Sequence, residues 1–266
     1  MKKVQIFTLA ILMGCGALFA QTNFRITVGG AMPMGDFGKA KVTSDGIEQW
    51  ALANYDDNHS KKGGAGMGFT IGLQGKIGFS GVEGLGATIS VDGFFNWLNQ
   101  DINDFYEECE DQAGTIVSEN IKLNYYSVNK PKYINIAPMV GLNYQYNIND
   151  EIGIYTGFGV GANIRYITDF ELDEKATNLD NYSHVTIREN LEYHSALSFA
   201  YKIGVGAIIS KRFVIGIDYF NLGMSKIKGT FFGNIKDDYE SENETFSFRA
   251  GKVNPMFLTL SIGVQF

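Results

Sequence analysis

The 266-residue sequence has little cysteine, only four prolines, and no long hydrophobic run after its first 20 residues. Cys109 is the only cysteine beyond that first segment, so we expect no internal disulfide. A membrane-spanning helix needs about 20 consecutive apolar residues, and no later segment approaches this, which excludes helical spans. Barrel strands are not excluded, because about 10 alternating residues suffice and average to a neutral hydropathy. The mean hydropathy of the chain is −0.07.

Positive charge is also scarce. The net charge is −7, and it becomes −9 if Lys2 and Lys3 are removed with the first segment. A chain this acidic lacks the basic surface that binds phosphate backbones, so we expect no nucleic-acid partner. The abundant residues are glycine, at 32, and aromatics, at 14%. This composition is typical of many strands that carry small residues on one face.

The first 20 residues have the layout of a secretory signal. Two lysines precede an apolar stretch over 4–13, and small residues lead to an Ala20-Gln21 junction that suits signal peptidase. We therefore predict a cleaved signal peptide over 1–20 and one mature domain over 21–266. The alternative is a lipoprotein signal acylated at Cys15. The residues after Cys15 stay apolar where a lipoprotein turns polar, which disfavours it.

Eight segments alternate with a period of two, as strands with two different faces do. They are Phe24–Met32, Met67–Phe79, Leu85–Trp97, Tyr133–Tyr146, Ile152–Tyr166, Ser195–Ile209, Phe213–Leu222 and Met256–Phe266.

Short and long connections between these segments strictly alternate. The short ones are 80–84, 147–151 and 210–212, and the long ones are 33–66, 98–132, 168–194 and 223–255. This pattern predicts an all-β fold: an eight-stranded antiparallel up-and-down transmembrane barrel in the outer membrane, with short periplasmic turns and long extracellular loops.

The two faces of each segment differ in a way that favours a lipid-facing exterior. In 152–166, one face carries Ile154, Phe158 and Ile164, whereas the other is mostly glycine with Tyr155 and Arg165. A soluble barrel would need the large residues inside, and a glycine-rich face offers little apolar area for a core. We therefore expect the large apolar residues to face lipid and the small and polar ones to face the lumen.

All charged residues within the segments fall on the small-residue face. In the lumen they can pair, whereas a lipid-facing Arg or Lys costs roughly 2–4 kcal/mol near the midplane. We expect them to form a polar network that plugs the lumen together with Gln74 and Tyr155, because eight strands leave room only for side chains. The alternative is a path for protons or small ions. The six charged residues are Arg25, Lys76, Asp92, Arg165, Lys202 and Asp218.

Aromatic residues cluster near the strand ends, where interfacial girdles form in membrane barrels. The predicted periplasmic girdle is Phe24, Phe79, Tyr146, Phe213 and Phe266. The predicted outer girdle is Trp97, Tyr133, Tyr166 and Tyr219.

The mature chain resembles the outer-membrane β-barrel domain family of small OmpA-like and PorT-like barrels of Gram-negative bacteria. The matching pieces are Gly29-Gly-Ala-Met-Pro-Met-Gly-Asp-Phe37, Tyr133-Ile-Asn-Ile-Ala-Pro138 and the aromatic end Ser261-Ile-Gly-Val-Gln-Phe266. The last piece, with Gly263 and Phe266, is similar to the signal read by the barrel-assembly machinery. The resemblance implies that the barrel-assembly machinery and outer-membrane lipids are partners. It specifies an architecture and does not specify an activity.

The long connections hold 24 of the 29 acidic residues. The densest runs include Glu107, Glu108, Asp237 and Asp238, which are weak candidates for Ca²⁺ or Mg²⁺ ligands. Neither run has the spacing of an EF-hand, and solvated acidic loops are common, so we expect no metal site and no cofactor.

Catalytic residues are equally sparse. The three histidines, His59, His184 and His194, all lie in the long connections. His194 adjoins Ser195, but neighbours on a strand point to opposite faces, and His184 would need Ser183 or Asp180 as a partner. The Cys109 thiol has acidic neighbours that disfavour a thiolate. We therefore expect no enzyme, with a rim-active hydrolase as the last of three hypotheses.

The last long connection contains two strand-like stretches, 226–235 and 244–251, around an acidic tip. They predict a ribbon that protrudes from the membrane and whose edge can pair with another chain. Ten barrel strands remain an alternative if 116–126 or 182–193 enter the membrane. The leading hypothesis is a structural or surface-interaction barrel with a protein partner at its loops. The second is an accessory subunit of an envelope secretion or assembly machine, as the PorT-like resemblance implies.

Overall fold

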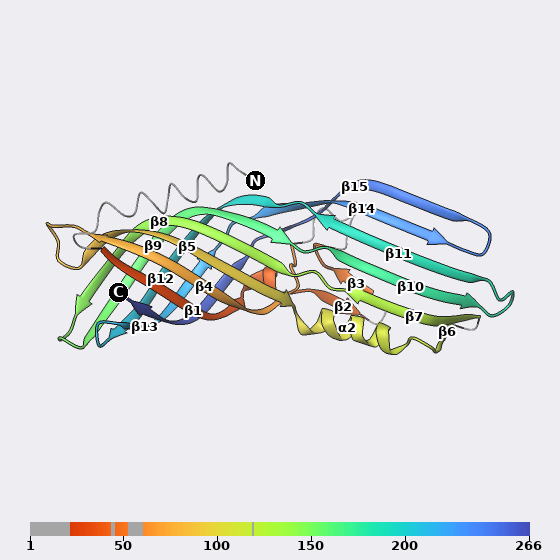
Figure 1. Cartoon of the computed structure of the whole chain (residues 1–266), viewed down its shortest axis with the longest axis horizontal. Helices are drawn as coiled ribbons and strands as arrows, with labels where there is room; N and C mark the ends of the chain where they lie inside the picture. The colour runs from red at the N-terminus through yellow and green to blue at the C-terminus, as the bar shows by residue number, and fades with distance from the viewer. Residues whose placement is uncertain (1–21, 44–45, 53–60, 119) are drawn as a thin grey trace.

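The structure, a computed structural model, describes residues 22–43, 46–52, 61–118 and 120–266. The predicted signal peptide, Cys15 and His59 lie outside these residues. The described chain forms a barrel and a second sheet that extends from one end of it (Figure 1).

Eight antiparallel strands close the barrel in the order β1-β16-β13-β12-β9-β8-β5-β4. Their bounds are β1 (Thr22–Pro33), β4 (Ala65–Gly78), β5 (Leu85–Leu98), β8 (Tyr133–Asn147), β9 (Ile152–Ile167), β12 (Ala196–Ile209), β13 (Phe213–Asn221) and β16 (Met256–Gln265). The ring closes at β1, where Arg25 lies opposite both Gln265 of β16 and Gln74 of β4. The predicted eight-stranded closed barrel is confirmed.

The predicted faces are confirmed as well. In β9, Ile154 and Phe158 are about half exposed, whereas Tyr155 and Asn163 are buried. Alternation along a strand sends successive side chains to opposite faces of the sheet, so the large residues cover the outside and the small or polar ones fill the inside.

Short turns join β4 to β5, β8 to β9 and β12 to β13, all at one end of the barrel, here called the turn end. The tightest is at Ser210 and Lys211, whose φ angles of 53° and 61° are left-handed. These residues lie in the three-residue loop 210–212, and left-handed residues are common in short hairpin loops because their twist matches that of the strands. The C-terminus also lies at the turn end, where Phe266 and Phe24 exchange two backbone hydrogen bonds.

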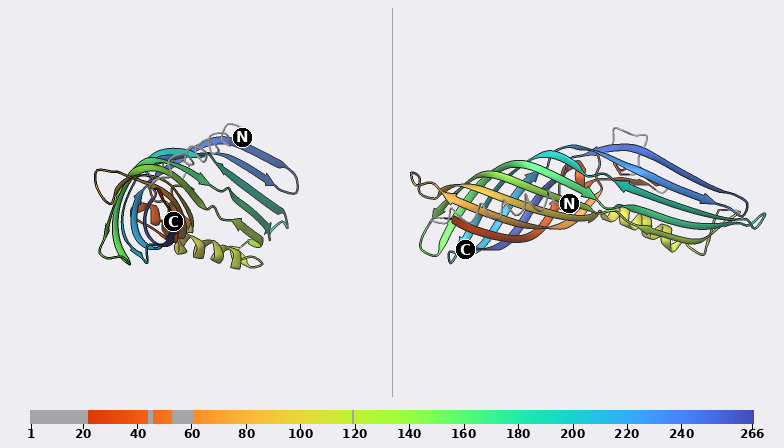
Figure 2. Two further views of the ribbon diagram at one scale, coloured as in Figure 1. Left: turned by 60° about the vertical axis from the view of Figure 1, so that its left-hand side comes forward. Right: turned by 45° about the horizontal axis from the view of Figure 1, so that its top comes forward.

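Beyond the opposite end, the loop end, lies a six-stranded sheet in the order β15-β14-β11-β10-β7-β6, here called the distal sheet (Figures 1 and 2). Its strands are β6 (Ile116–Ser118), β7 (Ile121–Asn129), β10 (Phe170–Asn178), β11 (His184–Tyr193), β14 (Ser225–Lys236) and β15 (Ser241–Val253). Five of them continue barrel strands after gaps of two or three residues: β7 leads into β8, β9 into β10, β11 into β12, β13 into β14, and β15 into β16.

The predicted ribbon is therefore real, as β14 pairs with β15. It is also part of a larger sheet that the sequence pattern did not reveal. The ten-strand alternative is wrong, because β7 and β11, which cover most of 116–126 and 182–193, pair with β10 in the distal sheet and not in the barrel.

The remaining connections fold against the loop end. Residues after β1 form a 3-10 helix, η2 (Gly35–Gly38), and a small hairpin of β2 (Lys41–Thr43) and β3 (Gly46–Gln49). After β5 comes a helix that was not predicted, α2 (Gln100–Asp111), whose first turn is capped by the Asn99 side chain accepting from Ile102 N. Among the described residues, no helix has the length and apolarity to cross a membrane.

Candidate functional site

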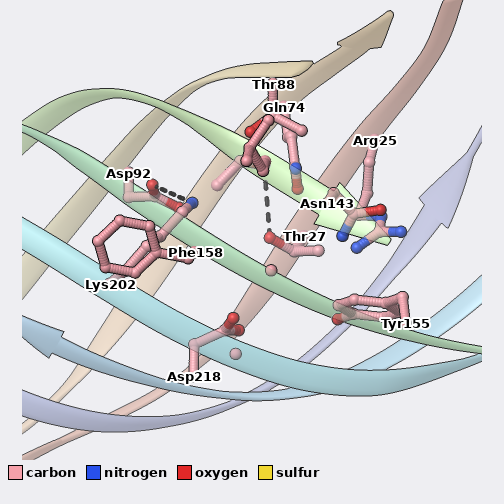
Figure 3. A pocket seen from close by; sticks show the side chains of 14 residues that line it. Arg25, Thr27, Gln74, Thr88, Asp92, Asn143, Tyr155, Phe158, Lys202 and Asp218 are labelled. Atoms are coloured by element: carbon pink, nitrogen blue, oxygen red, sulfur yellow. Dashed lines mark hydrogen bonds and ion pairs between the residues drawn. The ribbon is translucent and has the colours of Figure 1, made fainter. Parts of the chain in front are cut away.

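The middle of the lumen is crossed by a buried ion pair. Lys202 Nζ of β12 lies 2.7 Å from Asp92 Oδ2 of β5, and Ser90 Oγ donates to the same carboxylate oxygen at 3.1 Å (Figure 3). Two strands separate β12 from β5 in the barrel order, so the pair bridges the lumen and does not merely join neighbours.

A second contact bridges the lumen from β1 to β9. The Arg25 guanidinium lies 4.0 Å from the ring centroid of Tyr155, and Arg25 Nη2 donates to Gln265 Oε1 at 3.0 Å. Asp218 of β13 lines the same space (Figure 3). Two cationic and two anionic side chains therefore meet in the middle of the lumen and balance in charge.

The space left among these side chains is small. The cavity that they line, together with Gln74, has a volume of about 40 Å³, which holds about three waters. The sequence predicted this arrangement of Arg25, Asp92, Lys202 and Asp218, including the participation of Gln74 and Tyr155. Side chains thus fill the middle of the lumen.

The other two predicted members of the network lie apart from this group. Lys76 is near the turn end, where its Nζ donates to Gly84 O at 2.7 Å. Arg165 is near the loop end, where its Nη2 donates to Lys226 O at 3.0 Å. The six predicted residues are therefore not joined by one continuous set of hydrogen bonds and ion pairs among the described residues. Phase along a strand places a side chain inside, but its height in the barrel depends on the register.

Between the central group and the loop end, a cluster of aromatic side chains fills part of the lumen, which the sequence pattern did not suggest. Phe94 and Phe257 stack at 4.7 Å between centroids, and Phe37 of η2 packs edge-on against Phe257 at 5.4 Å. Trp50 is 1% exposed and donates through Nε1 to Gly63 O at 2.9 Å. The connection after β1 thus closes the loop end with aromatic side chains.

Most of the predicted girdle residues face outward, with exposed fractions between 44% and 72%. These are Phe24, Phe79, Trp97, Tyr146, Tyr166, Phe213 and Phe266. Tyr219 is half-buried beside Tyr201 and donates to Met256 Sδ at 3.4 Å.

Tyr133 is a correction to the predicted girdle. It is 0% exposed and donates to Gly63 O inside the loop end. The reason is its phase, because it shares the lumen face of β8 with Asn135 and Ala137. Proximity to a strand end was therefore not enough to place an aromatic ring in the girdle.

The acidic metal candidates do not converge. Glu107 pairs with Lys130 at 3.6 Å, Asp238 accepts from the His184 backbone, and Asp237 accepts from the backbones of Tyr239 and Glu240. Those two backbone donors lower the pKa of Asp237. Within the described residues, no three such side chains are placed to share a metal ion.

The histidines contact threonines and not serines. His184 Nδ1 lies 2.9 Å from Thr177 Oγ1, while Ser183 Oγ donates to Asn181. His194 Nε2 lies 3.5 Å from Thr230 Oγ1. The pairing of His184 with Ser183 that a rim-active hydrolase would use is not formed.

Cys109 lies on α2 against β7 of the distal sheet. Burial raises the pKa of its thiol, and Glu108, Glu174 and Glu110 raise it further, whereas a hydrogen bond with Tyr126 lowers it. The thiol is therefore less acidic than an ordinary cysteine, as its acidic neighbours predicted.

The two faces of the distal sheet differ. One face is packed against α2 and the loop end, with Leu191, Phe231 and Phe248 buried and Tyr106 of α2 lying 5.8 Å from Phe170 between centroids. The opposite face is polar, and Asp173 and Arg188 form an ion pair on it at 3.6 Å. The edge strand β15 is exposed over 241–247.

Comparisons with known proteins bear only on the fold. No family model matches the chain, and no curated protein matches it in sequence. Among solved structures, the attachment invasion locus protein Ail of Yersinia pestis is similar at 15% identity and a TM-score of 0.35, covering 92% of this chain and 99% of that chain.

The outer membrane protein OprG from Pseudomonas aeruginosa is similar at 11% identity and a TM-score of 0.38, covering 92% and 95% of the two chains. A major outer membrane protein from Thermus thermophilus is similar at 11% identity and a TM-score of 0.37, covering 92% of this chain and 99% of that chain. At such low identities and TM-scores, the function must be argued from the geometry of this chain.

Proposed function

We propose that this protein is a non-enzymatic outer-membrane barrel that holds the distal sheet outside the cell as a surface for interaction. The observation that carries the proposal is an apolar belt. Every barrel strand exposes a large apolar side chain near its middle, by 41% or more of its surface: Val28, Ile71, Val91, Val140, Phe158, Val205, Ile217 and Leu260. Water disfavours so continuous an apolar surface, whereas lipid solvates it.

The charged residues support the same orientation. The eight barrel strands contain six charged side chains, and all lie on the lumen phase. The lumen itself is closed in the middle by the Lys202–Asp92 ion pair and at the loop end by aromatic side chains. A closed lumen favours a structural or interaction role over solute transport.

The membrane position is tested by heat-modifiability. A folded barrel of this kind resists detergent and migrates faster on a gel before boiling than after boiling. We expect the faster form for protein extracted from outer membranes, and protease shaving of intact cells should release fragments from 168–194 and 223–255. A single band at both temperatures, or shaving that leaves these segments intact, would overturn the proposal.

Closure of the lumen has its own test. Purified protein in planar bilayers should show no steady conductance steps, because the central cavity holds only about three waters. Reproducible steps in the wild-type protein would favour the ion path over the plug.

The second candidate function is that of an accessory subunit in an envelope machine. The observation in its favour is the exposed edge strand β15, which among the described residues has a partner strand, β14, on one side only. Native proteins usually protect such edges, so an open one suits pairing with a partner strand.

Crosslinking in intact envelopes, with a photoreactive residue at Thr245, tests this second candidate. A partner captured there and lost on deletion of 226–251 supports it. A matched probe at Thr186, which lies inside the distal sheet, should capture nothing. Equal capture at both positions, or none at Thr245, contradicts it.

A further inference from the structure

Arg165 is a buried cation near the loop end of the lumen. It lies directly opposite Asn135 across the β8–β9 ladder, and the two residues are 1% and 0% exposed. An arginine guanidinium keeps its charge in proteins, so burial cannot neutralise it by loss of a proton.

Three hydrogen-bond donors at this point have no protein acceptor. Arg165 Nη2 donates to Lys226 O, but Arg165 Nε and Nη1 have no hydrogen-bond partner and are shut off from water. Asn135 Nδ2 also has no partner, nor has Asn163 Oδ1 beside it, while Asn163 Nδ2 donates to Asn135 Oδ1 at 3.1 Å. Side chains directly opposite on neighbouring strands lie about 5 Å apart at Cβ, so Arg165 and Asn135 are side by side on the lumen face.

The charge of Arg165 is also unbalanced. In the middle of the lumen, Lys202 pairs with Asp92, and Asp218 lines the same cavity as Arg25. Among the described residues, Arg165 has no carboxylate partner. An unpaired buried charge is strongly unfavourable, so a native protein supplies a counter-charge.

We propose that a small inorganic anion, of the size and charge of chloride, binds Arg165 and Asn135 inside the barrel as a structural ion. It accepts from Arg165 Nε and Nη1 and from Asn135 Nδ2, and it neutralises the guanidinium. Water can accept these hydrogen bonds but leaves the charge unbalanced.

Unfolding in urea, measured for the protein in detergent micelles at constant ionic strength, tests the proposal. Replacing gluconate by chloride should raise the unfolding midpoint of the wild-type protein, and the rise should continue with the logarithm of chloride concentration. Arg165→Met should abolish the dependence. The control Lys202→Met removes a lumen cation that already has a carboxylate partner, so it should keep the dependence. Equal dependence in wild type and Arg165→Met would overturn the proposal.

Crystals of the wild-type protein grown in bromide give a second measurement that does not rely on a variant that folds. We expect an anomalous peak beside the Arg165 guanidinium and Asn135 Nδ2. Density for waters alone at that position, without anomalous signal, contradicts the proposal. Both measurements are independent of what the distal sheet binds and of the membrane in which the barrel lies.

Discussion

Gly29 and Gly30 are adjacent in β1 but face opposite sides of the barrel wall. A Cβ on Gly29 would lie 2.2 Å from Leu260 O of the neighbouring strand, whereas a Cβ on Gly30 would meet nothing within 4 Å. The first position is closed by backbone, which cannot move aside as a flexible side chain can. The small residues on the lumen face therefore include positions that close strand packing requires.

Substituting these two glycines tests that statement. Gly29→Ala should lower the free energy of unfolding by about 1–3 kcal/mol, because the strands must shift to accept the methyl group. Gly30→Ala should change it by less than about 0.5 kcal/mol. Urea unfolding in lipid vesicles measures both, and equal effects would show that the β1–β16 spacing is not limiting.

The Lys202–Asp92 ion pair gives a second prediction at the residue scale. Lys202→Met should destabilise the barrel by about 3–5 kcal/mol, because it leaves the Asp92 carboxylate buried without its cation. Adding Asp92→Asn removes that charge and should restore most of the loss. The double-variant cycle in urea checks this. Additive losses from the two substitutions would mean that the residues do not interact.

At the scale of elements, α2 and the distal sheet meet through a face that contains two glutamates. Burial raises the pKa of Glu174 and of Glu189, and for Glu189 the neighbouring Glu174 raises it further. Cys109, Tyr126 and Glu110 lie close to Glu174 on the same face, and none of them is a cation that could pair with an ionised carboxylate.

A raised pKa in the folded state means that the folded state binds the proton more tightly. The protonated glutamates therefore stabilise the folded state fully at a pH below 4.5, the ordinary pKa of the group. This stabilisation is lost as the pH rises through the raised pKa of the folded state. We expect the amides of the distal sheet to be better protected from exchange, relative to the barrel, at about pH 5 than at neutral pH.

Hydrogen exchange, corrected for the intrinsic pH dependence of the rate, measures this difference. Glu174→Gln with Glu189→Gln should remove it, whereas Glu171→Gln, on the polar face, should not. Protection that is higher at neutral pH in the wild-type protein would be opposite in sign to the prediction.

The elements differ in whether the sequence predicted them. The strand segments were predictable because alternation of large and small residues repeats over nine or more positions. The helix α2 was missed although Asn99 precedes it and Ile102 and Tyr106 repeat at helical spacing, because half of its residues are acidic. Two of the strands of the distal sheet, β10 and β11, carry charge on both faces, which weakens alternation as a signal.

At the scale of the whole molecule, the barrel and the distal sheet expose apolar side chains to different surroundings. Val205 on the barrel and Ile235 on the distal sheet are 54% and 52% exposed. If lipid surrounds only the barrel, the same substitution has different consequences at the two positions.

Val205→Lys should lower the free energy of unfolding in lipid vesicles by roughly 2–4 kcal/mol, since a charge near the midplane must leave water. Ile235→Lys is the matched control and should change it by less than about 0.5 kcal/mol. Similar values for the two variants would show that the belt does not face lipid.

The sequence by itself determined the number of barrel strands, their faces and the alternation of short and long connections. It could do so because each of these depends on local periodicity and on segment length. Only the tertiary structure decided the rest. Register set which lumen charges meet, joining Asp92 to Lys202 and leaving Arg165 apart. Pairing between distant connections made one distal sheet out of what the sequence showed as separate loops. Such contacts join residues far apart in the chain, and no local pattern encodes them.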